Sequence, residues 1–473
     1  MEIIKEQLKA VVGGEHVICE PEDLKSYARD NITFIPPRFP LLAVKPGSVE
    51  EIQAVLKIAV LNKLPVIPSS SRTNGHGSSI PSIPGVIIDL RRLNKIHLID
   101  DLCRNAVIEP GVTFTELQKS AKAHGLRVLT PIELPAESSV ISTYVEMTPL
   151  YAWPKYGTES ILTMEALLPN GELLKTGMAA IPVMDKAYFP FGTMPSYLNK
   201  VFCGAQGTLG IVTRATIKLK TDFKTQRVLF IPFTSFEACF PVLKEIKRLD
   251  SPVEFFIADA TYLAGLLSGD HETFSSLQHT LSPQTAVLVL RGEKEQVEYQ
   301  VADLTELAEK MNVELLDTLP ADRGAAKKLL QEIEFPDGYE KFKKIKGYYG
   351  VIPFICMTRQ IPIFNRVVAG IVRSFGYDPK NIGALLLPVE PSRVHFQYAF
   401  YTGPEGSEDY RAVEKLFGTV SSTLLRMGAF FSRPYGSWPG QVYAKAGSYK
   451  AMLKQIKEAI DPENIMNPGK LNL

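Results

Sequence analysis

The chain has 473 residues, of which 45% are hydrophobic and 22% charged, so it can bury large cores and is unlike a disordered protein. Its 52 Lys and Arg residues nearly balance 51 Asp and Glu residues, leaving a net charge of +1. This balance argues against a nucleic-acid binder, because no excess of positive charge is present to hold a phosphate backbone. At roughly 150 residues per domain, the length predicts about three domains.

The first hundred residues alternate helix and strand signals, which favours α/β structure. Ser48, with Glu51 three residues later, fits a capping box that begins an amphipathic helix. Residues 65–68 and 86–90 predict two short buried strands, joined by a polar loop over residues 69–79.

From about residue 106 the pattern changes to short strands and turns. Thr113 is expected to cap a helix over residues 114–124, which Gly125 ends. A different block of strands and helices follows from about residue 223 to residue 420. The remaining predicted elements are strands at 106–109, 162–168 and 210–219 and a helix at 448–460.

Cysteines are few and widely spaced. There are five, with no Cys-x-x-Cys pair among them: Cys19, Cys103, Cys203, Cys239 and Cys356. This spacing argues against an internal iron–sulfur cluster, a zinc knuckle and a disulfide framework, so we expect no metal site. Residues 1–17 predict an amphipathic helix that contains acids, unlike a signal peptide, and no segment approaches about 18 uninterrupted apolar residues. We therefore expect no membrane span and a cytoplasmic location.

The loop from Ser69 to Ser79 carries the strongest chemical signal. It contains three consecutive serines, one arginine and two glycines around His76, and no acid. Such a loop after a buried strand can present hydroxyls and backbone N–H groups to an anion such as a pyrophosphate. By itself, the composition also fits a solvent-exposed turn.

Four segments in a fixed order favour the first interpretation. They are PVIPSSSRTNGHGSS, AVIEPGVTFTELQ, FCGAQGTLGIVTRATIKL and the terminal DPENIMNPGKL. Together they resemble the FAD-binding domain of the vanillyl-alcohol oxidase/p-cresol methylhydroxylase superfamily, and the chain looks most like the phenol-oxidising branch. The resemblance covers the chain from about residue 30 to its end.

The resemblance implies an α+β fold with FAD as cofactor. It predicts an FAD-binding domain over residues 1–222, made of subdomains at about 1–100 and 101–222. A cap domain over residues 223–420 would cover the isoalloxazine, and residues 421–473 would return to the FAD domain.

The resemblance also predicts the residues that contact FAD. The strongest match is the pyrophosphate loop, and three further segments follow it. The glycines at 207 and 210 would also fit a plain β-turn, and Asn467 would also fit a turn that ends a helix. The predicted cofactor-binding residues are Pro68, Ser69, Ser70, Ser71, Arg72, Thr73, Asn74, Gly75, Glu137, Ser138, Ser139, Ser142, Gly207, Gly210, Ile211, Val212 and Asn467.

The second of these segments departs from the family pattern. Where the family has glycines and a Gly-Asn pair, this chain has Ser138, Ser139, Tyr144 and Val145. Serine hydroxyls can replace some backbone contacts, whereas Tyr144 is expected to pack against the flavin or to restrict the space beside it.

Four residues are predicted to act on the substrate. His76 matches the tyrosine that helps the phenol oxidases bind phenolate, and either faces the substrate or bonds a loop carbonyl. Arg433 matches an arginine that binds phenolate; its fork suits a carboxylate or phenolate, with a structural ion pair as the alternative. Tyr435 is a further candidate contact. Thr158 matches the catalytic acid of the phenol oxidases, whose function it cannot perform; packing or a bond to flavin is the simpler role.

We therefore expect an FAD-dependent oxidoreductase that takes a hydride from a small hydroxylated or phenolic, anionic substrate onto flavin N5. Alternatives are a 2-hydroxy-acid dehydrogenase of the glycolate or D-lactate type, and a flavin-binding electron-transfer or non-catalytic subunit. Leu385 matches the position of covalent attachment in some relatives and cannot form that bond, so non-covalent FAD is predicted unless His395 takes the role. The electron acceptor is expected to be oxygen, a cytochrome or an iron–sulfur or flavoprotein subunit, and the chain a homodimer or part of a complex.

Overall fold

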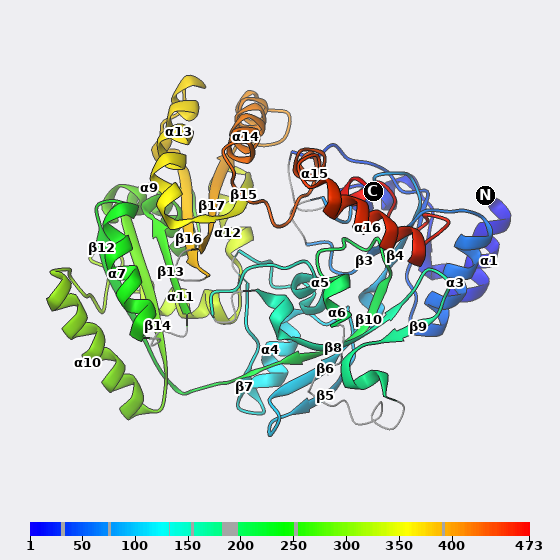
Figure 1. Ribbon diagram of the computed structural model, residues 1–473, viewed down its shortest axis with the longest axis horizontal. Coiled ribbons are helices and arrows are strands. Elements are labelled where there is room, and N and C mark those ends of the chain that lie inside the picture. Colours follow the sequence, from blue (N-terminus) through cyan, green and yellow to red (C-terminus); the bar gives the residue numbers. More distant parts are fainter. Residues whose placement is uncertain are drawn as a thin grey trace.

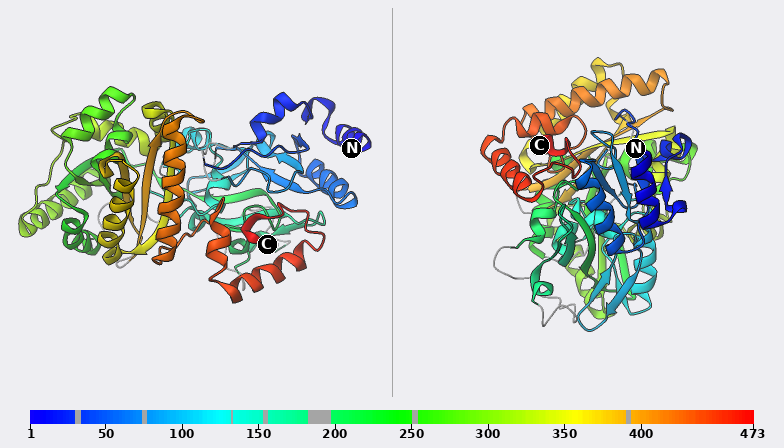
Figure 2. Two further views of the ribbon diagram at one scale, coloured as in Figure 1. Left: turned by 90° about the horizontal axis from the view of Figure 1, so that it is seen from above. Right: turned by 90° about the vertical axis from the view of Figure 1, so that its right-hand side faces the viewer.

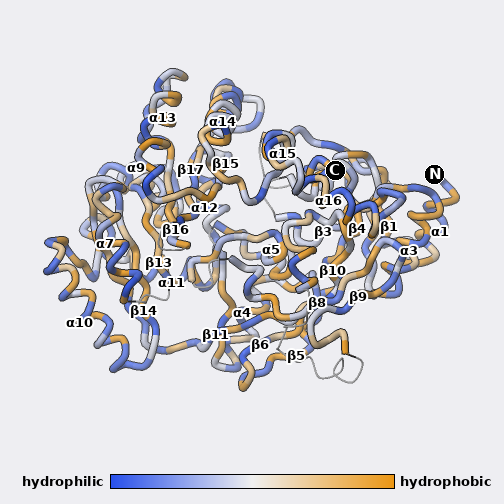
Figure 3. Tube along the Cα trace, in the orientation of Figure 1, coloured by the Kyte–Doolittle hydropathy of each residue, from blue (hydrophilic) through white to orange (hydrophobic). Residues whose placement is uncertain are grey.

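The structure is a computed structural model that describes residues 1–29, 34–73, 77–131, 133–152, 156–181, 197–249, 254–389 and 393–473. It has two lobes, and both ends of the chain lie in the same one (Figure 1). Both lobes combine helices with β-sheets, and the five-stranded and six-stranded sheets are antiparallel, in agreement with the predicted α+β fold. Hydrophobic residues are concentrated in the strands at the centre of each lobe (Figure 3).

The first subdomain is a small, mostly parallel sheet of order β1-β2-β4-β3. Helices α1 and α3 pack together against it. Ser48 caps α3 as predicted, because its Oγ accepts a hydrogen bond from the N–H of Glu51 at 3.2 Å. The elements are α1 (Glu2–Val12), β1 (Val17–Ile18), α2 (Pro21–Leu24), β2 (Leu42–Val44), α3 (Val49–Leu61), β3 (Val66–Ser69) and β4 (Val86–Asp89).

The second subdomain is an antiparallel sheet of order β5-β6-β10-β8-β9. Its principal helix begins at a complete capping box between Thr113 and Glu116, as expected. The elements are β5 (Ile96–Asp100), β6 (Asn105–Ile108), α4 (Phe114–Lys122), β7 (Leu126–Arg127), α5 (Val140–Val145), β8 (Ile161–Leu167), β9 (Leu173–Lys175), α6 (Asn199–Phe202), β10 (Ile211–Lys218) and β11 (Lys220–Thr221), the last of which pairs with β7.

The second lobe is an antiparallel sheet of order β12-β14-β13-β16-β17-β15 between two layers of helices. Helices α7, α10, α13 and α14 share one apolar core with it, and α8, α9, α11 and α12 share the other. Figure 2 shows these layers edge-on. The strands are β12 (Thr225–Phe233), β13 (Glu254–Asp259), β14 (Gln284–Gly292), β15 (Tyr348–Met357), β16 (Ile382–Pro388) and β17 (Arg393–Thr402). The helices are α7 (Phe236–Leu249), α8 (Ala260–Leu267), α9 (His271–Thr280), α10 (Lys294–Met311), α11 (Ala325–Glu334), α12 (Gly338–Lys346), α13 (Ile361–Ser374) and α14 (Glu408–Arg426).

The C-terminal segment returns to the first lobe with α15 (Trp438–Tyr443) and α16 (Gly447–Ile460) (Figure 1), and Ile456 and Ile460 of α16 pack against the core of the second subdomain. Val66 of β3 bonds with this segment in both directions: its N–H donates to Ile465 O at 2.7 Å, and its carbonyl accepts from Asn467 N at 2.8 Å. The buried ammonium of Lys457 donates to the carbonyl oxygens of Thr208 (2.8 Å) and Met466 (2.7 Å). Residue 421, the predicted boundary, lies inside α14.

A buried ion cluster joins the two lobes. Glu254 of β13 bonds Arg127 of β7 and, at 2.9 Å, Arg291 of β14. Each of these three side chains is at most 2% exposed. Arg291 also lies 3.3 Å from Glu334, which in turn pairs with Lys122 of α4 at 2.5 Å. Because Lys122 and Arg127 belong to the first lobe, the cluster fixes one lobe against the other.

Candidate functional site

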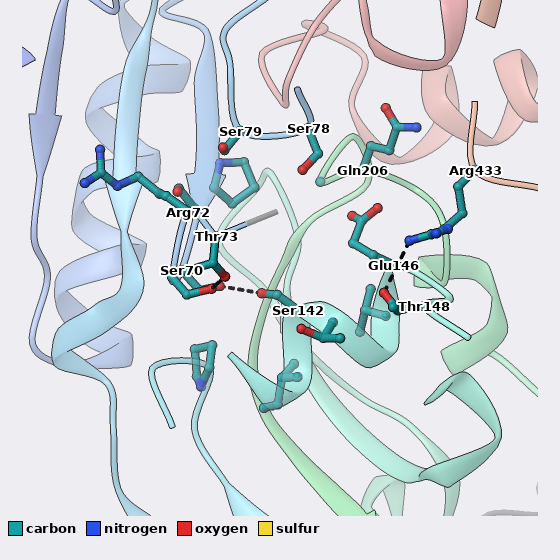
Figure 4. Close-up of a pocket in the computed structure, with 18 of the residues that line it drawn as sticks. Ser70, Arg72, Thr73, Ser78, Ser79, Ser142, Glu146, Thr148, Gln206 and Arg433 are labelled. Carbon is teal, nitrogen blue, oxygen red and sulfur yellow. Dashed lines mark hydrogen bonds between the residues drawn. The ribbon is translucent and has the colours of Figure 1, made fainter. Parts of the chain in front are cut away.

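A cleft opens where the two subdomains meet the second lobe, and its empty volume is about 1490 Å³ including the open mouth. The loop after β3, the segment around α5 and the entry to β10 form most of its wall (Figure 4). Four residues from the second lobe and one from the return segment complete it: Tyr339, Tyr349, Val351, Gln397 and Arg433. The cleft therefore collects residues that are far apart in the sequence.

Most of the predicted pyrophosphate loop lines this cleft. The described residues are Pro68, Ser69, Ser70, Ser71, Arg72 and Thr73. Asn74, Gly75 and His76 lie outside the described residues, so the predictions for them stay predictions.

A ladder of hydroxyl groups ties this loop to the segment that precedes and begins α5. Ser70 and Ser142 share a hydrogen bond between their Oγ atoms at 2.6 Å, and Thr73 and Ser138 share one at 2.5 Å. The N–H of Ser139 donates to Ser71 Oγ at 3.0 Å. Ser138, Ser139 and Ser142 therefore join this segment to the loop after β3.

Several buried polar atoms in the cleft wall have no hydrogen-bond partner within the described part of the chain. They are Ser69 Oγ, Ser79 Oγ and Gln206 Oε1. Because an unsatisfied buried polar group costs about 1–3 kcal/mol, such atoms indicate a polar ligand. Hydroxyl, amide and backbone groups of this kind fit the ribityl and phosphate oxygens of FAD.

The guanidinium of Arg72 does not point into the cleft. Its Nη1 donates to the carbonyl oxygen of Ser26, and its Cζ lies 4.0 Å from the centre of the Tyr27 ring. Arg72 has a φ of 57°, in the left-handed region, which turns the side chain outward. The Arg72 guanidinium is therefore not placed for the charge-assisted bond to phosphate that we expected, although the Arg72 backbone lies beside the cleft.

The segment from Glu137 to Tyr144 contains residues that line the cleft and residues that lie behind it. Ser142 lines it, whereas Ser138 and Ser139 are buried behind it and Glu137 is exposed. Tyr144 does not face the cleft: its hydroxyl donates to Leu129 O at 2.5 Å, and its ring packs in the core of the second subdomain. The expectation that Tyr144 restricts the flavin's space is wrong, because this segment forms a helix whose turn directs the ring inward.

The entry to β10 lies in the cleft wall, with Gly207, Gly210, Ile211 and Val212 lining it, and their contact with FAD stays a prediction. Gly207 has a φ of 69°, and a Cβ added to it would meet Pro68 Cγ at 2.5 Å, so only glycine fits there. Asn467 lies behind this turn, where its Nδ2 donates to Gln206 O at 2.7 Å.

Arg433 enters the cleft from the return segment (Figure 4). Its side chain is mostly buried, and its Nη1 lies 3.5 Å from Thr148 Oγ1. Tyr435 is buried near it, and its hydroxyl donates to the carboxyl of Glu146. Burial raises the pKa of Glu146, against the opposing effects of Tyr435 and the charges of Arg433 and Lys470.

Thr158 lies in a buried 3₁₀ turn over Gly157–Ser160 and is not among the described residues that line the cleft. Leu385 lies inside β16 and is fully buried. His395 is also buried; its Nε2 lies 3.3 Å from Gln397 Oε1, and burial lowers its pKa to about 3, so the imidazole is neutral.

Sequence reasoning missed two carboxyl groups in the cleft, those of Glu133 and Glu146. Glu133 accepts a hydrogen bond from Gln397 Nε2, and burial raises its pKa to about 8. Both acids stand alone in apolar stretches, LTPIEL and YVEM, which is the signal that marks a buried carboxyl.

Two family models match the chain. Residues 40–177 match an FAD binding domain, and residues 443–471 match the C-terminal domain of FAD linked oxidases. An FAD-linked oxidoreductase of Mycobacterium tuberculosis is 24% identical over 97% of this chain and 96% of its own. The glycolate oxidase subunit GlcD of Escherichia coli is 24% identical over 98% of this chain and 89% of its own. A D-lactate dehydrogenase of Anaerostipes hadrus is 25% identical over 97% of this chain and 95% of its own.

Solved structures share the fold. A p-cresol methylhydroxylase with substrate bound superimposes with a TM-score of 0.85 at 20% identity, covering 100% of this chain and 96% of its own. A 4-ethylphenol oxidase from Gulosibacter chungangensis gives a TM-score of 0.81 at 19% identity, covering 99% and 96%.

The two matched domains and the polar cleft define an FAD-linked oxidoreductase. The chain carries the FAD binding domain and the C-terminal domain of FAD linked oxidases, its cofactor is FAD, and its fold is that of p-cresol methylhydroxylase and 4-ethylphenol oxidase, which fits the resemblance of its motifs. No helix within the described ranges is long and apolar enough to cross a membrane.

Proposed function

We propose that this oxidoreductase takes a hydride from a small hydroxylated or phenolic, anionic substrate onto flavin N5. The observation that carries the proposal is Arg433, a buried guanidinium that opens into the same cleft as the serine loop. An arginine is permanently charged and offers a planar pair of donors, which suits a carboxylate or a phenolate.

The groups around Arg433 support this role. Thr148 and the Tyr435–Glu146 pair hold the wall beside it, and the second lobe adds Tyr339 and Tyr349, whose rings suit a small organic molecule. FAD supplies the redox chemistry when it is bound, and this chain supplies orientation, charge and a proton acceptor.

The main alternative within the proposal is a 2-hydroxy acid such as glycolate or D-lactate. The names of two sequence relatives favour it, whereas the names of two structural relatives favour an alkylphenol. Arg433 suits either anion. Within the described ranges, no group of three or more His, Cys, Asp or Glu side chains is arranged to hold a metal ion.

A second alternative is an electron-transferring or non-catalytic subunit. One relative is named as a subunit, and Thr158 stands where the phenol oxidases have their catalytic acid. Such a protein would bind FAD but would exchange electrons with a partner protein only.

Anaerobic flavin bleaching distinguishes these possibilities. We would mix the oxidised holoenzyme separately with glycolate, D-lactate, p-cresol and 4-ethylphenol, and follow the flavin absorbance. Bleaching by one of them supports the proposal and identifies the substrate class, and a much slower bleaching of Arg433→Met with full FAD content supports the anion site. A yellow protein that only a partner protein can bleach would support the subunit alternative. Reoxidation in air then tests oxygen as acceptor.

A further inference from the structure

Glu133 stands where the two lobes meet in the cleft, and none of the roles described so far uses it. Its backbone belongs to the first lobe, in the segment before α5, and has a φ of 51°. Its carboxyl accepts a hydrogen bond from Gln397 Nε2 of β17, and the Tyr349 hydroxyl of β15 interacts with it. Glu133, Gln397 and Tyr349 all line the cleft.

The orientation of Gln397 is fixed from behind. Its Oε1 lies 3.3 Å from Nε2 of His395, whose imidazole is neutral, and its Nε2 lies 3.3 Å from Tyr262 Oη. The amide N–H group therefore faces Glu133. This arrangement holds the carboxyl in one position without an ion pair to Lys or Arg within the described part of the chain.

The charges around Glu133 allow it to change protonation state near neutral pH. Burial raises its pKa to about 8, and the charge of Glu332 adds to this effect. The rise in the pKa of Glu133 is opposed by the bonds from Tyr349 and Gln397 and by the charge of Arg433. The neighbouring hydroxyls of Tyr151 and Tyr401 are neutral near pH 8, because burial raises their pKa. Glu332 itself is paired with Lys341 at 2.6 Å.

The other carboxyl in the cleft is in a different situation. Glu146 receives the Tyr435 hydroxyl and lies in the fields of two cations, Arg433 and Lys470. Two cations therefore act on Glu146, whereas the bonds to Glu133 found within the described ranges come from the neutral groups of Gln397 and Tyr349, and Glu133 lies at the boundary with the second lobe.

We propose that Glu133 is the catalytic residue that accepts the substrate's hydroxyl proton during hydride transfer. The inference rests on the proposed function. In the step, the C–H bond breaks and its electron pair leaves with the hydrogen as hydride to FAD. The O–H bond breaks, its proton goes to the Glu133 carboxylate, and the carbon–oxygen bond becomes a carbonyl. Two electrons and two hydrogens leave the substrate, and the reduced flavin and protonated Glu133 account for them.

The first test is the pH dependence of the limiting rate of anaerobic flavin reduction, measured by stopped flow with the compound that bleaches the wild-type flavin. Because the carboxylate is the active form, the rate should rise with pH through one ionisation near 8. Glu133→Gln should lower the rate by about 100-fold or more and remove the ionisation, since positioned bases contribute about 100- to 10,000-fold. A Glu133→Gln enzyme with the wild-type rate and pH profile would overturn the proposal.

Two comparison variants separate chemistry from structure. Glu146→Gln makes the same change at the other carboxyl that lines the cleft and should keep the ionisation. Gln397→Leu removes a donor that stabilises the carboxylate, so it should move the ionisation to higher pH, which a purely structural role would not do.

A second readout does not need turnover. Infrared difference spectra of the oxidised holoenzyme between pH 6 and pH 10 should show a protonated carboxyl band that is lost as pH rises and is missing in Glu133→Gln. If no compound bleaches the wild-type flavin, the proposed function fails, yet the band still tests the ionisation of Glu133. If substrates bleach the flavin but the band is absent, the Glu133 proposal alone fails.

Discussion

Ser70 and Ser142 share a hydrogen bond between their Oγ atoms at 2.6 Å, although they are 72 positions apart in the sequence. This bond joins the loop after β3 to α5, the two elements whose hydroxyls line one wall of the cleft. Ser138 and Ser139 bond the same loop through Thr73 and Ser71, so the serines that stand in place of glycines in this segment are compatible with the cleft.

The Ser142 hydroxyl should contribute measurably to FAD affinity. Replacing Ser142 by Ala leaves Ser70 without its partner and loosens the wall, at a cost of about 1 kcal/mol, which is roughly a fivefold increase in the dissociation constant. Titration of the apoprotein with FAD, followed by quenching of flavin fluorescence, measures it. Ser276→Ala, at an exposed position on α9, is the matched control and should bind FAD as the wild type does. Equal affinities for the two variants would show that the Ser70–Ser142 bond does not support the site.

Arg433 should affect substrate and flavin differently. Arg433→Lys keeps the charge but loses the planar fork, so we expect kcat/KM for an anionic substrate to fall by roughly 10- to 100-fold. The FAD content should stay unchanged, because the serine loop and the β10 entry carry most of the predicted cofactor contacts. Steady-state kinetics with absorbance-based flavin content measures both quantities. Loss of flavin together with activity would instead indicate that Arg433 supports cofactor binding.

FAD should be held without a covalent bond. Leu385 lies in the interior of β16 with no reactive atom, and His395 points to Gln397 rather than lining the cleft. Precipitation of the holoenzyme with acid should therefore release all yellow colour into the supernatant. Flavin that remains in the pellet would contradict the prediction, and loss of that retention in His395→Ala would then identify the attachment site.

Local signals in the sequence predicted the elements that position the cleft. Ser48 and Thr113 cap helices as expected, because a cap depends on residues only three positions away. The serine loop and Gly207 were also recognisable, since each is a short motif with its own backbone requirement. These elements form one wall of the site.

The other wall depends on contacts that no local pattern encodes. Arg72 turns away from the cleft because Tyr27 and Ser26, about 45 residues earlier, accept its guanidinium. The pKa of Glu133 rises because folding buries its carboxyl at the boundary between the lobes, where Gln397, 264 positions later, bonds it. Only the folded chain brings such residues together, so single-sequence reasoning could name their types but not their roles.

The buried cluster around Glu254 should dominate the coupling between the lobes. Glu254→Gln leaves Arg127 and Arg291 without the carboxylate between them, and breaking a buried pair in this way costs about 3–5 kcal/mol. Urea unfolding at pH 7 should show the variant unfolding at a lower urea concentration. Glu245→Gln removes an exposed pair with Arg248 and should change stability by less than about 0.5 kcal/mol.

The pH dependence of this difference has a defined sign. Burial opposes ionisation of Glu254, but the charges of Arg127 and Arg291 outweigh it and hold its pKa below the ordinary value of 4.5. A carboxyl with a lowered folded-state pKa contributes stability that is complete above 4.5 and is lost as pH falls through the folded value. The gap between wild type and Glu254→Gln should therefore be constant from pH 6 to pH 8 and shrink below pH 4.5. A gap that widens as pH falls would mean that Glu254 is protonated in the folded protein at neutral pH, contrary to the ion cluster.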